Sequence, residues 1–249
     1  MPAIGGTYWA VFVVASVFGA NMGDVAALYL GMGKLHGMPV LVLALFAILI
    51  AERLDNFSSS RAWYWMAIAL IPMVATNLGD FAVGRGYSRA WLVGGLVVLQ
   101  VVTYFGGRSE SEQVLATRLL TRPGAAARPM TDVSYWVAMV IASTLGPVVS
   151  DIFADRLHMG PLDSAAILLG LVAAVYGVRR LVKGSQPLVY WPAVILIRAA
   201  GNALGDVLAK DPRIHFGVGV SAALMGVLLV VLVVAAPDRK SAGGTSPQR

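Results

Sequence analysis

Apolar residues fall into eight long runs along the chain, separated by short stretches that carry most of the charged residues. A run of about 20 apolar residues is long enough to cross the hydrocarbon core of a bilayer as a helix. The pattern therefore predicts an all-α, polytopic membrane protein with eight transmembrane helices. The predicted helices span residues 8–30, 38–52, 62–83, 90–106, 134–155, 161–178, 188–209 and 215–236.

A tyrosine-tryptophan pair and an aspartate recur in register in every second predicted helix. The aspartate stands fifteen residues after the tryptophan in each copy, and the interval between them is apolar and rich in small residues. Such a period indicates an internal repeat. Because each repeat holds two helices, the four repeats are expected to be parallel to one another rather than inverted. The copies run from Tyr8-Trp9 to Asp24, from Tyr64-Trp65 to Asp80, from Tyr135-Trp136 to Asp151 and from Tyr190-Trp191 to Asp206.

The spacing of the repeats divides the chain into two duplicated halves. The interval between the second and third aspartates is longer than the two intervals within the halves. We interpret residues 1–106 as the first transmembrane half, 107–133 as a cytoplasmic linker, 134–236 as the second half and 237–249 as a disordered cytoplasmic tail. The middle of the linker, SEQVLATRLLTR, is either part of a plain tether or a short amphipathic helix on the membrane surface.

The composition limits the class of protein and its partners. Hydrophobic residues make up 58% and charged residues 13% of the chain, against about 25% charged in soluble domains. The absence of cysteine excludes disulfides and thiolate metal sites. The net charge of +6 does not indicate a nucleic-acid partner, because the basic residues lie in loops between apolar runs. The expected partner is the lipid bilayer. The sequence is compatible with a homo-oligomer but does not predict one.

The distribution of basic residues predicts the orientation. Twelve lysine and arginine residues lie in the loops and tail on the side of the termini, and six lie on the opposite side. Basic loops remain in the cytoplasm, so both termini are expected there. The four tyrosine-tryptophan pairs are then expected to form an aromatic belt at the cytoplasmic interface.

The aspartates are expected to lie inside the membrane. Fifteen helical residues span about 22 Å, while the hydrocarbon core is about 30 Å thick. An ionised carboxylate at such a depth costs at least about 2.5–3.5 kcal/mol when it faces lipid. We therefore expect Asp24, Asp80, Asp151 and Asp206 to face the interior and to surround a shared polar centre.

Polar neighbours extend these aspartates into a candidate transport or ion-binding site. Oxygen ligands without cysteine suit hard cations, such as a divalent metal, Na⁺ or H⁺. The four aspartates are the candidate ligands if the cation is a metal, and no other cofactor is expected. The remaining candidates are Asn21, Asn77, Asn202, Asp155 and Arg198.

Two features have two interpretations each. Glycines near the aspartates, such as Gly19 and Gly201, allow either close helix packing or a break in the helix that exposes carbonyls to an ion. Arg198 either forms a buried ion pair with Asp24, Asp80 or Asp151, or serves as a charge that substrate displaces or that binds an anionic substrate.

The segments STLGPVVSD and RAAGNALGD resemble an uncharacterised family of bacterial membrane proteins, built from four copies of a short repeat of unknown function. Members show a glycine, often followed by an acid, and an aspartate five positions after the glycine. The resemblance covers nearly the whole chain and implies a bacterial cytoplasmic (inner) membrane. The chain departs from the pattern where members often carry glutamate, since it has Ala20, Thr76, Pro147 and Asn202 there.

No catalytic motif is present, since the chain lacks Gly-x-Ser-x-Gly, His-Glu-x-x-His and a P-loop. An enzyme is therefore not expected. Our leading hypothesis is a transporter or channel for a hard cation that uses the intramembrane aspartates. The alternative is a structural or accessory membrane protein whose aspartates and Arg198 stabilise the bundle. A third hypothesis is a membrane-embedded enzyme that acts on lipid.

Overall fold

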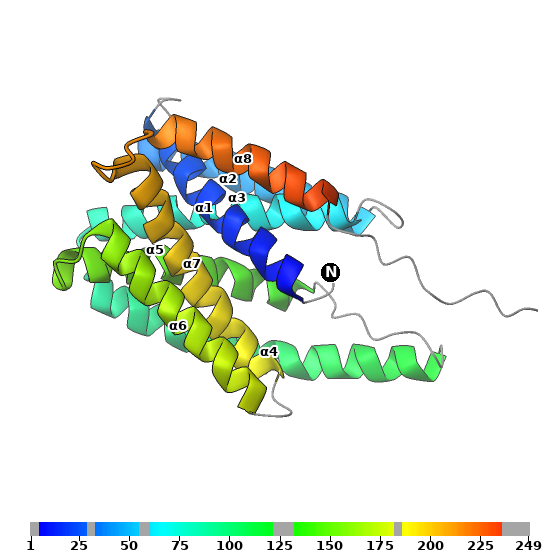
Figure 1. The fold of residues 1–249 in the computed structure, drawn as a ribbon. Coiled ribbons are helices and arrows are strands. Elements are labelled where there is room, and N and C mark those ends of the chain that lie inside the picture. The colour runs from blue at the N-terminus through cyan, green and yellow to red at the C-terminus, as the bar shows by residue number, and fades with distance from the viewer. Residues whose placement is uncertain (1–4, 29–32, 55–59, 122–131, 182–185, 236–249) are drawn as a thin grey trace, which may run out of the picture.

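The computed structural model describes residues 5–28, 33–54, 60–121, 132–181 and 186–235. These residues form eight helices and no strand, as the sequence predicts. Seven of the helices are long and apolar enough to cross a membrane, and the other one, α2, holds a shorter apolar stretch at Met38–Ala51. The helices are α1 (Gly6–Leu28), α2 (Gly33–Leu54), α3 (Ser60–Gly84), α4 (Arg89–Thr121), α5 (Val133–Arg156), α6 (Pro161–Leu181), α7 (Gln186–Lys210) and α8 (Val218–Ala235) (Figure 1).

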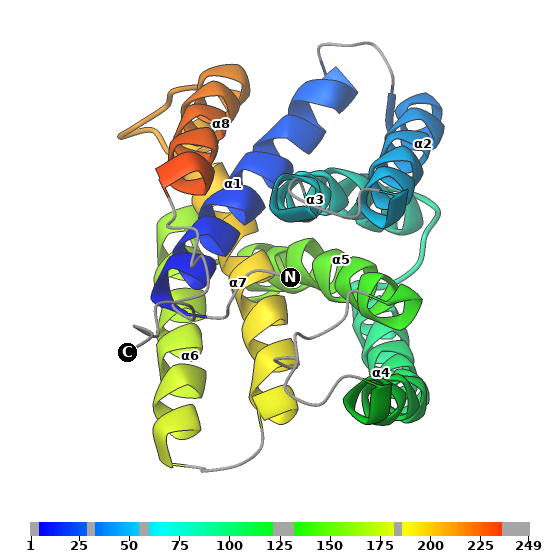
Figure 2. The ribbon, with the colours of Figure 1, turned by 90° about the vertical axis from the view of Figure 1, so that its right-hand side faces the viewer.

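The helices form an inner and an outer layer. The odd-numbered helices α1, α3, α5 and α7 pack in a closed ring around one axis, each against the next and α7 against α1. The even-numbered helices stand outside this ring (Figure 2). More than half of each inner span is buried, whereas at most 17% of the spans of α4, α6 and α8 is buried. The chain is therefore a multi-pass membrane protein whose outer helices present apolar faces to lipid.

Each outer helix packs on the inner helix of the following repeat. The main partner of α2 is α3, that of α4 is α5 and that of α6 is α7. The last helix, α8, completes the circle by packing on α1. Two helices that follow each other within a repeat are therefore not a self-contained hairpin. The four tyrosines meet at one end of the bundle, which confirms that the repeats are parallel.

Glycines bring neighbouring inner helices into close contact. A Cβ atom at Gly19 would lie 2.6 Å from the backbone oxygen of Ala69, and one at Gly201 would lie 2.5 Å from the Cβ of Ser16. The same atom at Gly146 would lie 2.6 Å from the Cβ of Arg198. The inner helices run unbroken through all three positions. The packing interpretation of these glycines is therefore correct, and the helix break is not observed.

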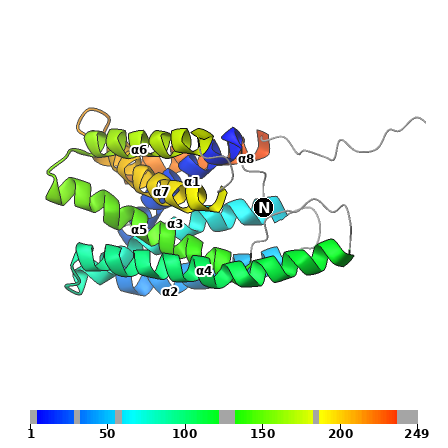
Figure 3. The same cartoon turned by 90° about the horizontal axis from the view of Figure 1, so that it is seen from below.

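Helix α4 is longer than the sequence pattern predicts. It continues to Thr121 instead of ending near residue 106, and it extends past the rest of the bundle (Figure 3). The extension includes SESEQVLATRLL, which is rich in good helix formers and contains neither glycine nor proline. The first part of the expected linker is thus helical. The expected tail, 237–249, lies outside the described residues.

Candidate functional site

Four tyrosine hydroxyl groups form a closed ring of hydrogen bonds on the bundle axis. The oxygen–oxygen distances are 2.8 Å for Tyr8–Tyr64, 2.8 Å for Tyr64–Tyr135, 3.0 Å for Tyr135–Tyr190 and 2.8 Å for Tyr190–Tyr8. In a ring of this kind each hydroxyl donates one bond and accepts one. Tyr8 and Tyr64 are almost completely buried. The prediction that the tyrosines belong to an interfacial belt is therefore wrong, because they point into the bundle.

The tryptophans enclose this tyrosine ring. Each one makes an edge-to-face contact with the tyrosine before it, at 5.1–5.2 Å between ring centroids. Each also packs on the tyrosine of the repeat before it around the ring. Trp65 packs on Tyr8 at 5.4 Å, and Trp9 of the first repeat packs on Tyr190 of the fourth at 5.7 Å. Aromatic pairs favour such offset and edge-on arrangements. The eight rings therefore form a continuous aromatic collar at the tyrosine end.

The guanidinium of Arg198 lies on the axis next to the tyrosine ring. The residue is 2% exposed, and its group is within electrostatic range of all four tyrosines. Its Nη1 donates to the hydroxyl oxygen of Ser16 at 3.1 Å, and its Nη2 donates to the backbone oxygen of Ile68 at 3.0 Å. Nη2 also lies 3.9 Å from the sulfur of Met139. The guanidinium stands 4.4 Å from the centroid of the Phe12 ring, so it contacts all three other inner helices.

A proline explains why a backbone oxygen is available inside a helix. The carbonyl of Ile68 would normally accept from the N–H of the residue four positions later, which is Pro72. Proline has no N–H, so that helical bond cannot form. Arg198 of α7 supplies the missing donor. A kink-prone proline on one helix and an arginine on another thus satisfy a single buried carbonyl.

Arg198 has no carboxylate partner among the described residues, so the predicted ion pair with an aspartate is wrong. The reason is the level of each group along the axis. Arg198 follows its tyrosine by eight residues, whereas the aspartates follow theirs by sixteen. In parallel repeats this difference separates the two levels by about 12 Å. The guanidinium also points toward the tyrosines and away from the carboxylates.

Two of the predicted site aspartates meet on one lysine. The Nζ of Lys210 lies 2.6 Å from an oxygen of Asp206, one turn back on α7, and 3.6 Å from an oxygen of Asp24 on α1. Asp80 also lies within electrostatic range of Asp24. The side chain of Lys210 is 54% exposed and those of the two paired aspartates are about a third exposed. This group, called the aspartate–lysine cluster below, is thus open at the end of the bundle opposite the tyrosines.

The aspartate of the third repeat, Asp151, has a different partner. An oxygen of Asp151 on α5 lies 3.6 Å from the Nε of Arg89, the first residue of α4. Across the described ranges, no group of three or more histidine, aspartate or glutamate side chains is arranged to hold a metal ion. The described residues therefore show a pair of aspartates on Lys210 and a separate pair with Arg89, rather than one ring of four carboxylates.

The other predicted site residues have varied surroundings. Asn21 is buried against Gly205, where an added Cβ would lie 3.0 Å from its Oδ1. Asn77 donates its Nδ2 to the carbonyl of Met73 at 2.8 Å, four residues back on its own helix. Asn202 is half-buried. The side chain of Asp155 lies outside the part of the chain that the structure describes.

Sequence reasoning did not select Lys210 or Arg89, although Lys210 follows Asp206 by four residues, the spacing of a helical ion pair. It also missed Ser16 and Ile68. Ser16 could have been found, because it occupies the same place after its tyrosine as Arg198 does. Pro72 in the sequence indicates that the carbonyl of Ile68 lacks its helical hydrogen bond. The sequence does not indicate that Arg198 is the donor that binds it.

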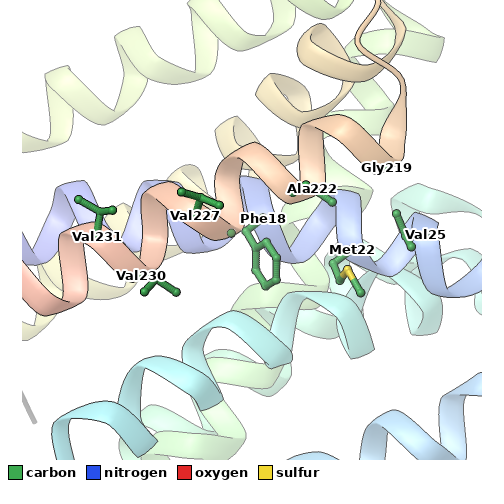
Figure 4. A pocket seen from close by; sticks show the side chains of 10 residues that line it. Phe18, Met22, Val25, Gly219, Ala222, Val227, Val230 and Val231 are labelled. Atoms are coloured by element: carbon green, nitrogen blue, oxygen red, sulfur yellow. The ribbon is translucent and has the colours of Figure 1, made fainter.

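An apolar groove lies away from the axis, between α1 and α8. It has a volume of about 550 Å³ and is lined by residues that include Phe18, Met22 and Val227 (Figure 4). No charged side chain lines it. In a membrane this surface faces the lipid chains, so it carries none of the polar chemistry described above.

Comparison with known proteins supports a repeat protein. Residues 134–185 and 189–236 match the Repeat of Unknown Function (DUF347). The two matches correspond to the third and fourth repeats, each with one inner and one outer helix. Neither the curated proteins nor the solved structures contain a match to the chain. The second half is thus similar to a repeat family of unknown function, and the activity has to be argued from the residues.

Proposed function

We propose that the protein is a cytoplasmic-membrane transporter for a hard cation, either H⁺, Na⁺ or a divalent metal, and that the aspartate–lysine cluster is its binding site. The contact of Lys210 with both Asp24 and Asp206 carries this proposal. Two carboxylates from different helices share one positive charge, which in this structure is the side-chain ammonium of Lys210. A cation that displaces the ammonium finds the same oxygen ligands.

The partial exposure of the cluster supports access from one side of the membrane. The axis beyond it is occupied by Arg198 and the tyrosine ring. A carrier that alternates between two states fits this arrangement better than a permanently open channel. The basic loops favour cytoplasmic termini, in which case the aspartate end faces outward.

Cation flux in proteoliposomes tests the proposal. We expect Asp206→Asn and Asp24→Asn to abolish flux, because each removes one of the two converging charges. Asp163→Asn is a matched control, since Asp163 is an exposed aspartate in the first turn of α6, and it should transport like the parent. Unchanged flux in both site variants, or no flux of H⁺, Na⁺, Mg²⁺ or Mn²⁺ in the parent, contradicts the proposal.

A structural role is the second candidate, and one observation favours it. The contact of Lys210 with Asp24 joins α7 to α1, and that of Arg89 with Asp151 joins α4 to α5. Replacing Lys210 separates the two functions. In a transporter, Lys210→Met leaves the carboxylates of Asp24 and Asp206 without their ammonium partner. An added cation then binds between them and stabilises the folded protein, so the melting temperature of the variant rises with cation concentration. In a purely structural protein, the variant melts lower and no cation restores it.

A further inference from the structure

The axial surroundings of Arg198 have the chemistry of a binding site. We propose that Phe12, Ser16, Ile68 and Met139 form a receptor for a guanidinium cation, which Arg198 occupies as a tethered ligand. This site lies on the axis between the tyrosine ring and the level of the aspartates. It is separate from the aspartate–lysine cluster.

The groups around the guanidinium are complementary to it and are all neutral. An aromatic face, a hydroxyl oxygen, a proline-freed carbonyl and a thioether sulfur meet it from three helices. Guanidinium is planar and weakly hydrated, and it stacks on aromatic rings while donating in its plane. An ammonium would lack this planar fork. The receptor thus discriminates by shape and by hydrogen bonding rather than by a counter-charge.

The repeat symmetry sets Arg198 apart, because no other repeat carries a charge at the equivalent place. The places equivalent to Arg198 hold Ser16, Pro72 and Ser143 in the other three repeats. The receptor groups themselves belong to these other repeats, and most of them stand four residues after a tyrosine. Because the receptor residues lie on other helices, we expect Arg198→Ser to remove the ligand and to leave the receptor in place. The Arg198 side chain therefore fills the receptor on the bundle axis.

Thermal unfolding of detergent-solubilised Arg198→Ser tests the receptor with a free ligand. We expect guanidinium chloride at low millimolar concentration to raise the melting temperature in a saturable way, and methylguanidinium to do the same. Urea, the neutral molecule of matching shape, should have no such effect. The parent should not respond, because its receptor is filled. Arg85→Ser is the matched control, since Arg85 stacks on Phe81 at 4.9 Å but is exposed, and guanidinium should not stabilise it.

If Arg198→Ser unfolds during purification, the same comparison is made on recovery. Folded protein that is obtained only when guanidinium is present, and not with urea or NaCl, supports the receptor. A variant that neither recovers nor shifts with guanidinium overturns it, as does an equal shift with urea or an equal response of Arg85→Ser. Absence of guanidinium binding combined with intact cation flux in the parent would reject this inference and leave the proposed function standing.

Discussion

Arg198 donates a hydrogen bond of 3.0 Å to the backbone oxygen of Ile68, an acceptor that exists because Pro72 follows Ile68 by one helical turn. A buried guanidinium without a carboxylate is unusual, because burying a charge is costly unless it is paired. Here the charge is met by oxygen, sulfur and aromatic groups of the three other inner helices. The arginine therefore joins all four repeats at a single point.

The proline and the arginine should be coupled energetically. Pro72→Ala removes an interior helical proline, which costs about 3 kcal/mol, but its new N–H competes with Arg198 for the Ile68 carbonyl, and a hydrogen bond to a charged group contributes about 1.5–3 kcal/mol. We therefore expect little net change in the parent and a clear stabilisation in an Arg198→Leu background, where nothing competes. A double-mutant cycle of melting temperatures measures this difference. Equal stabilisation in both backgrounds would contradict the relationship.

The two serines at equivalent places in repeats 1 and 3 should differ in their contribution to stability. The hydroxyl of Ser16 donates to the Phe12 carbonyl and accepts from Arg198, and a hydrogen bond to a charged group contributes about 1.5–3 kcal/mol. Ser16→Ala should destabilise by that order. The hydroxyl of Ser143 is buried without a hydrogen-bond partner in the described structure, so Ser143→Ala should be neutral or slightly stabilising. Chemical unfolding of both variants checks this contrast, and equal losses would refute it.

The tyrosine ring should respond non-additively to the loss of its hydroxyls. Tyr64→Phe removes two of the four ring bonds and leaves its neighbours with buried hydroxyls that have lost partners, at a cost of about 1–3 kcal/mol. Once one hydroxyl is gone, each further Tyr→Phe change removes less. The variant with all four phenylalanines should therefore lose less than the sum of the four single variants. Additive losses in thermal unfolding would mean that the ring is not a cooperative unit.

Glycines at helix contacts should be intolerant of a methyl group, in contrast to glycines that face open space. In Gly201→Ala the new Cβ overlaps Ser16 on α1, and overpacking of this kind typically costs about 1–3 kcal/mol. Gly170→Ala on α6 is the control, because no atom lies within 4 Å of its added Cβ. That change should stabilise by up to about 1 kcal/mol through helix propensity. Melting temperatures that move in the same direction for both would contradict the packing described above.

The sequence was sufficient to predict eight helices, the parallel repeats and the shared register of the aspartates. It could not give the rotation of each helix about its own axis. Sixteen residues separate a tyrosine from its aspartate, which is about 160° of helical rotation. The tyrosine hydroxyls meet on the axis, whereas the carboxylates of Asp24 and Asp206 meet Lys210 at the contact of α1 with α7 and stay partly exposed. The sequence also could not show that Arg198 points toward the tyrosines, since its partners come from other repeats.

The circular packing of the outer helices has a consequence for biogenesis. Helix α1 is made before α8, the helix that covers it, and six other helices are made between the two. Until α8 is inserted, Phe18 and its neighbours on α1 are exposed to lipid. The tyrosine ring is complete only after the fourth repeat has arrived. Premature termination anywhere before α8 thus yields a chain in which α1 is left uncovered.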